Sequence, residues 1–102
     1  MKNELTMKTK PLPMKYENLL TRNGVDTSKL VYRVMGSKLL TEGIHNNNYV
    51  VIINRKNEKE ISVSVFCMNL KIVLSNDTFN FTDKKYLQEI VKKVKTYLAV
   101  SE

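Results

Sequence analysis

The chain has 102 residues, 42% hydrophobic and 26% charged, a composition that fits one folded domain and excludes wholesale disorder. Seventeen Lys and Arg residues against ten Asp and Glu give a formal net charge of +7, and a single cysteine excludes an intramolecular disulfide. Because no apolar run approaches the ~20 residues that cross a bilayer and no secretory signal is present, we expect a soluble, cytoplasmic protein with no membrane partner.

The first residues differ from the rest of the chain. Residues 1–13 show no apolar period, and Pro11 and Pro13 exclude a continuous helix through this segment. Four lysines against one glutamate give residues 1–15 a local charge of +3. The sequence therefore predicts a flexible basic arm over residues 1–13, followed by a single α+β domain over residues 14–102.

A short first helix is predicted over residues 13–22. Tyr16, Leu19 and Leu20 share one helical face, and Asn23-Gly24 provides a left-handed stop. The run at residues 30–35 is β-branched and aromatic, which suits a strand, although a helix capped at residues 26–28 is the alternative. We favour the strand because Gly36 ends the run too soon for a long helix.

An antiparallel β-meander of three to five strands is predicted for the middle of the chain. Residues 38–44 have weak strand character, and Gly43 with residues 46–48 marks a turn. Residues 49–53 are all apolar, as in a central strand, and residues 61–67 alternate as in a half-buried partner strand. Alternation resumes at Leu70, Ile72 and Leu74, and again at Phe79 and Phe81 after a turn signal at residues 75–77.

The last element is an amphipathic helix that Thr82 or Asp83 caps. Its apolar stripe is Leu87, Ile90, Val91, Val94 and Leu98, with Tyr97 at the edge, and its opposite face carries Lys84, Lys85, Lys92, Lys93 and Lys95. Phe81 and Tyr86 have the spacing of a hydrophobic staple, and Glu89 with Lys93 forms an i,i+4 pair. The fold class is α+β: a short N-terminal helix, the meander, and this helix packed on the sheet.

Residues that carry chemistry are sparse. Alternation places Cys67 on the core side of its strand, and His45, the only histidine, is expected to be exposed in a loop. No second histidine completes a metal site, and the three glycines lie too far apart for a phosphate-binding loop. We therefore expect no enzymatic activity, no metal and no cofactor.

Two kinds of binding are weighed. The favoured function is a small non-enzymatic binding protein, a regulatory or inhibitory accessory that docks on a larger protein or nucleoprotein complex. The excess of lysine and asparagine associates the chain with a low-GC bacterium or its phages and plasmids. The alternative is direct, sequence-independent binding of DNA or RNA, and a homo-oligomer is a third possibility. Contact with nucleic acid or a partner is assigned to basic residues of the arm, a hairpin and the last helix: Lys8, Lys10, Lys15, Arg55, Lys56, Lys59, Lys92, Lys93 and Lys95.

Three aromatic residues, Tyr32, Tyr49 and Phe66, have a strand parity that can turn them outward. The parity of Phe66 opposes that of Cys67, so Phe66 faces the other side of the sheet. There it is either a contact residue or part of a second core layer. We expect the second case, with the short first helix covering that face.

Overall fold

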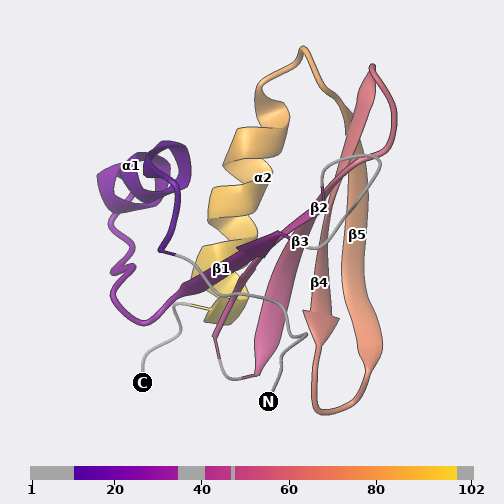
Figure 1. The fold of residues 1–102 in the computed structure, drawn as a ribbon. Coiled ribbons are helices and arrows are strands. Elements are labelled where there is room, and N and C mark those ends of the chain that lie inside the picture. The colour runs from indigo at the N-terminus through magenta and orange to yellow at the C-terminus, as the bar shows by residue number, and fades with distance from the viewer. Residues whose placement is uncertain (1–10, 35–40, 47, 99–102) are drawn as a thin grey trace, which may run out of the picture.

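The computed structural model describes residues 11–34, 41–46 and 48–98. The fold consists of an N-terminal helix, a five-stranded antiparallel sheet and a C-terminal helix (Figure 1), which confirms the predicted α+β fold. In chain order the elements are α1 (Met14–Arg22), β1 (Val31–Val34), β2 (Thr41–His45), β3 (Tyr49–Arg55), β4 (Glu60–Cys67), β5 (Ile72–Asn80), α2 (Lys85–Lys93) and η1 (Val94–Leu98). The last of these is a π-helical segment that continues α2.

The sheet is a simple meander in the order β1-β2-β3-β4-β5, with every neighbouring pair antiparallel. β3 is the central strand, as its apolar run predicts, and residues 31–34 form the favoured strand and not a helix. The register aligns Ile44 with Val51 and Val51 with Val65, and all three side chains are fully buried. One face of the sheet therefore carries the core.

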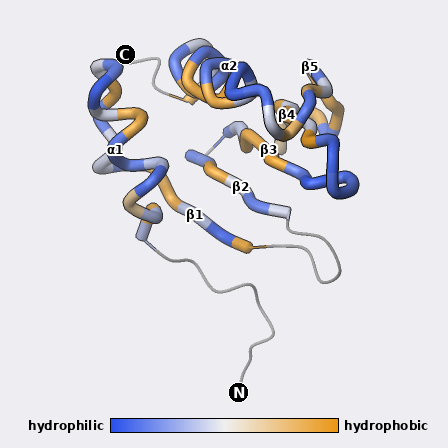
Figure 2. Tube along the Cα trace, turned by 90° about the horizontal axis from the view of Figure 1, so that it is seen from above, coloured by the Kyte–Doolittle hydropathy of each residue, from blue (hydrophilic) through white to orange (hydrophobic). Residues whose placement is uncertain are grey.

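Both helices pack on this same face of the sheet (Figure 2). Tyr16 and Leu20 of α1 join Ile90 and Val94 of α2 in one buried cluster with the strand residues. The prediction that α1 covers the face of Phe66 is wrong, because the buried residues of α1 contact the opposite face.

The end of α1 follows from Asn23-Gly24, as predicted. Gly24 has a φ of +84°, a left-handed conformation that glycine adopts without strain. The N–H of Gly24 donates to the Thr21 carbonyl at 3.0 Å, and the N–H of Val25 donates to the Leu20 carbonyl at 3.0 Å. These two bonds form a Schellman motif, and Val25 and Leu20 are both buried beneath it.

A buried carboxylate joins α1 to the sheet. Glu42 on β2 is 4% exposed, and its two oxygens accept hydrogen bonds of 2.5 Å from the hydroxyls of Tyr16 and Tyr32. Burial, followed by the hydrogen bond to Glu42, raises the pKa of both tyrosines well above the ordinary value, so both remain donors. Two strong donors partly replace the water that the carboxylate loses.

β5 differs from its prediction. Residues 75–77, expected to form a turn, lie inside a continuous nine-residue strand. The register shifts between Val65 and Phe66, which pair with Ser75 and Val73, so Leu74 is the extra residue of a bulge. Polar residues persist along β5 because it lies at the edge of the sheet, where most of its side chains are exposed.

The last helix begins at Lys85 with Lys84 at the N-cap position, one or two residues later than the predicted caps. The Asp83 carboxylate accepts a hydrogen bond of 3.1 Å from the N–H of Lys85, whereas the Thr82 hydroxyl donates to the Asn80 side chain at 2.7 Å. Asp83 thus takes part in the start of the helix and Thr82 does not. The predicted staple required Thr82 as the cap, so its helical spacing is not present, but the Phe81 and Tyr86 rings do stack, with centroids 5.8 Å apart.

Most of the predicted arm, residues 1–10, lies outside the described residues. Leu12, at its C-terminal end, is partly buried against the core, so the last residues of this segment contact the domain.

Candidate functional site

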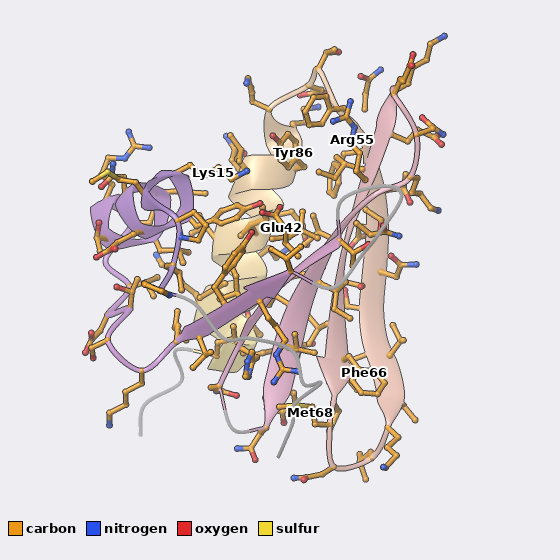
Figure 3. All side chains as sticks on the ribbon, in the orientation of Figure 1. Lys15, Glu42, Arg55, Phe66, Met68 and Tyr86 are labelled. Atoms are coloured by element: carbon orange, nitrogen blue, oxygen red, sulfur yellow. The ribbon has the colours of Figure 1, made fainter. Side chains whose placement is uncertain are left out.

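The largest exposed apolar surface among the described residues lies at one end of β5. Leu70, Ile72, Val73 and Leu74 are 67, 47, 59 and 39% exposed. Phe66 and Met68, both half-buried, lie near the same end of the β4–β5 hairpin (Figure 3). We refer to Phe66, Met68, Leu70, Ile72, Val73 and Leu74 as the 66–74 patch. Exposed large apolar side chains are common singly, but a contiguous group is typical of an interaction surface.

The β4–β5 turn fixes the position of this patch. The N–H of Lys71 donates to the Cys67 carbonyl at 2.8 Å, and the N–H of Met68 donates to the Asn48 carbonyl at 2.9 Å. Lys71 has a φ of +59°, which turns the chain back into β5. Val73 then pairs with Phe66 on the face away from the helices, and Ile72 pairs with Cys67 on the helix side. The patch therefore wraps around the sheet edge.

The edge itself is long and unprotected. Among the described residues, β5 pairs only with β4, so alternate residues along this strand direct backbone donors and acceptors outward without a strand partner, and of these the Asn80 carbonyl accepts from the Asp83 N–H at 3.0 Å. The strand contains no lysine, arginine or proline, the residues that usually prevent pairing at an edge. Only the bulge at Leu74 interrupts it.

A buried lysine holds the middle of β5 against α2. Lys93 is 4% exposed, and its ammonium donates to Asp77 at 2.8 Å, to Glu89 at 2.6 Å and to Ser75 at 2.7 Å. Burial alone lowers the pKa of Lys93, but the hydrogen bonds to Asp77 and Glu89 outweigh it and raise that pKa. The bond from Lys93 also lowers the pKa of Asp77. The cluster thus connects the edge strand to α2 beside the patch.

This cluster corrects one predicted contact. Lys93 was expected on the solvated lysine face of the last helix, but the fold places its ammonium between α2 and β5 and neutralises it with two carboxylates. It follows that the Lys93 ammonium, although charged, is not available for contact with phosphate. Its predicted i,i+4 pair with Glu89 is confirmed.

The other predicted cations lie in separate places. Arg55, Lys56 and Lys59 come together at the β3–β4 turn, and Lys15 on α1 lies with Arg55 at a pocket beside Glu42. Lys92 on α2 and Lys95 on η1 are exposed. Lys8 and Lys10 lie outside the described residues. Of the predicted set, the structure therefore brings together one hairpin group and Lys15.

The cysteine and histidine have structural surroundings. Cys67 is a free, buried thiol, as expected from its strand parity. His45 is not in a loop: it ends β2, is half-buried, and its Nε2 accepts from Arg33 Nε at 3.2 Å. Its Nδ1 lies 3.1 Å from the Asn46 carbonyl, so a ring protonated at Nδ1 satisfies both contacts. Strand pairing of residues 41–45 with β3 and β1 places this histidine in the sheet.

No metal centre or membrane span is found in the described ranges. They contain no group of three or more His, Cys, Asp or Glu side chains placed to hold a metal ion. None of their helices is both long enough and apolar enough to cross a membrane.

Comparison with known proteins adds no relative: the chain matches no family model, no curated protein and no solved structure.

Sequence reasoning missed the exposure of the patch, because it recorded only that Leu70, Ile72 and Leu74 alternate and did not assign them to an edge strand. A signal was present in Ile72-Val73-Leu74, three successive apolar residues that break a period of two at the edge of a predicted meander. Alternation within one strand cannot show which strand lies at the edge, and edge position decides exposure here.

Proposed function

We propose that this chain is a non-enzymatic binding protein that docks on a larger protein by accepting an extended segment of that protein as a sixth strand beside β5. The observation that carries the proposal is the combination of an unpaired nine-residue edge with four exposed apolar side chains at one end of it. Main-chain hydrogen bonds supply affinity in strand addition, and apolar contacts supply specificity.

The chemistry of the partner segment follows from the surface. Successive side chains of an added strand point to opposite faces of the sheet. At this end of β5 one face carries Val73 and the other Ile72, so the side chains of the partner would be apolar on both faces. Lys71 and Lys92 are exposed near the same strand and α2, which favours acidic residues flanking the apolar ones. In this proposal the chain acts as a regulatory or inhibitory accessory, because the partner's segment, once bound beside β5, can no longer contact other proteins.

Nucleic-acid binding is the rival function, and a separate salt titration with labelled DNA and RNA tests it. The Lys93 ammonium is paired with two carboxylates, so it is not available for contact with phosphate. The exposed hairpin lysines Lys56 and Lys59 remain free to meet phosphate.

The test is capture of a partner by the tagged full chain from nuclease-treated extract of the source cells at high salt. Val73→Lys places a charge at the edge without disturbing the core, and Asn18→Lys adds the same charge on an exposed position of α1. We expect the wild-type chain and Asn18→Lys to retain one partner and Val73→Lys to lose it. The captured complex is then crosslinked and digested. We expect the crosslinks between the partner and this chain to map to β5.

Three outcomes contradict the proposal. Equal capture by Val73→Lys would show that the edge is not the docking surface. A dimer in light scattering that Val73→Lys abolishes would make a second copy the occupant. Binding of labelled DNA or RNA that falls ~10³-fold or more between about 50 and 200 mM salt, and that Lys56→Gln and Lys59→Gln weaken, would make nucleic acid the ligand.

A further inference from the structure

A second feature, independent of the β5 edge, is a pocket at the opposite end of the core. It has a volume of about 200 Å³ and lies between α1, α2 and the sheet. Its walls are Lys15, Tyr16, Glu42, Ile53, Arg55, Ile61, Phe81 and Tyr86. Figure 3 shows Lys15, Tyr86 and Arg55 toward the upper end of the molecule, with Glu42 below them.

The charges that face this pocket do not cancel. Glu42 supplies one buried negative charge, already held by two tyrosine hydroxyls. Lys15 and Arg55 supply two positive charges, and the Lys15 ammonium is 3.9 Å from the nearer Glu42 oxygen, beyond hydrogen-bond distance. The pocket therefore carries a net charge of about +1, which one monoanion would balance.

Lys15 and Arg55 both have N–H groups that donate no hydrogen bond within the described ranges. Arg55 uses its Nε–H and one Nη2–H on the carbonyls of Asn57 and Glu58, and its remaining N–H groups have no acceptor among the described residues. Its guanidinium is held 3.4 Å from the centroid of the Phe81 ring, so its orientation is fixed before a ligand arrives. Lys15 forms an ion pair with Glu42 at 3.9 Å but makes no hydrogen bond within the described ranges, and its ammonium lies 4.8 Å from the centroid of the Tyr16 ring.

The remaining walls are aromatic and aliphatic. Tyr86 stacks on Phe81 with the ring planes 22° apart, and Ile53 and Ile61 line the sheet side. Flat apolar walls of this kind favour a flat apolar ligand body through burial and ring stacking. The volume is smaller than that of sites for drug-sized ligands, so the ligand is a compact one.

We propose that this pocket binds a small organic monoanion, a carboxylate on a flat unsaturated ring, with the carboxylate between Lys15 and Arg55 and the ring against Tyr86. Glu42 excludes dianions and holds the tyrosine hydroxyls away from the ligand. The pocket is then a ligand site separate from the docking edge, and neither depends on the other.

The experiment is a titration of the ¹⁵N-labelled full chain with benzoate, followed by NMR. We expect saturable shifts at the Arg55 Nε–H and at the backbone of Glu42 and Tyr86, with a dissociation constant on the order of millimolar for a ligand of this size. Benzamide, which has the same shape without the charge, should bind about tenfold more weakly or worse, because the charge-assisted hydrogen bonds are lost. Acetate, which lacks the ring, should also bind more weakly.

Variants locate the site. Lys15→Gln and Arg55→Gln should each weaken benzoate binding about tenfold, whereas Lys59→Gln, in the same hairpin as Arg55 but outside the pocket, should leave it unchanged. Arg55→Gln also removes two hydrogen bonds within the hairpin. Lys15 is exposed, so Lys15→Gln tests the pocket without that structural change. Val73→Lys should bind benzoate like the wild type, which separates this proposal from the docking edge.

The proposal is overturned if benzamide or acetate binds as tightly as benzoate, if the shifts spread over exposed lysines without saturating, or if Lys59→Gln weakens binding as much as Lys15→Gln.

Discussion

The ammonium of Lys93 on α2 donates to the carboxylate of Asp77 on β5 at 2.8 Å, across the gap between the last helix and the edge strand. Glu89 and Ser75 complete its surroundings at 2.6 and 2.7 Å. A lysine buried among three acceptors is satisfied, but removal of its charge leaves carboxylates without a partner. The pair therefore makes the position of β5 depend on α2.

Replacement of Lys93 with methionine tests this dependence. Methionine keeps the apolar stem of the side chain and removes the ammonium. We expect Lys93→Met to lower the free energy of unfolding by about 1–2 kcal/mol, less than for a fully buried pair because water reaches Asp77. Urea denaturation measures it. Lys92→Met, the exposed neighbour, is the control and should change stability by less than about 0.5 kcal/mol; equal losses in the two variants would contradict the role of the buried ammonium.

Acid should weaken the same contact. The hydrogen bond from Lys93 lowers the pKa of Asp77 below its ordinary value of 3.8. A carboxyl whose pKa is depressed in the folded state stabilises the fold above the unfolded pKa, and this contribution is lost as the pH falls through the folded pKa. The stability difference between wild type and Asp77→Asn should thus shrink as the pH falls below about 4.

The Lys93→Met background is the control for this pH effect. Without the ammonium, the largest cause of the lowered pKa is gone, so Asp77→Asn should show little pH dependence there. The measurement is the urea midpoint at neutral and acid pH of four proteins: the wild type, Asp77→Asn, Lys93→Met and the double variant. A pH dependence that persists in Lys93→Met would assign it to another carboxyl.

Tyr16 provides the matching test on the other side of the core. Tyr16→Phe removes one of the two hydroxyls that donate to the buried Glu42 carboxylate. We expect a loss of about 1.5–3 kcal/mol in the free energy of unfolding, the range for a hydrogen bond to a charged group. Tyr97→Phe is the control: it keeps the ring tilted against Tyr49, with centroids 5.5 Å apart, and removes a hydroxyl with no hydrogen bond to the described residues. A loss as large in Tyr97→Phe would show that the effect does not come from Glu42.

Local signals were sufficient for most of the fold. Asn23-Gly24 predicts the end of α1, because a left-handed residue is a property of the chain at one point. The apolar run of β3 and the alternation of β4 predict buried strands, because side-chain parity follows from strand geometry. These features need no information about distant residues.

The candidate surfaces needed the fold itself. Lys93 has the same spacing as an exposed helix lysine, and only the position of β5 buries it. Glu42 lies two residues before Ile44, so a period of two places it on the core face, but the tyrosines that hold it come from α1 and β1. The pocket joins Lys15 to Arg55 across 40 residues of sequence, and no local pattern connects them.

The β4–β5 turn supplies a last prediction, a stabilising one. Lys71 has a φ of +59°, a conformation in which a residue with a Cβ is strained by roughly 1 kcal/mol and glycine is not. We expect Lys71→Gly to raise the free energy of unfolding slightly, by up to about 0.5 kcal/mol, since relief of strain exceeds the added freedom of the unfolded chain. Lys56→Gly, in the β3–β4 turn at a residue without a positive φ, is the control and should lower stability. Urea denaturation of both variants compares them directly, and a loss of stability in Lys71→Gly would mean that the turn does not hold this residue in the left-handed region in solution.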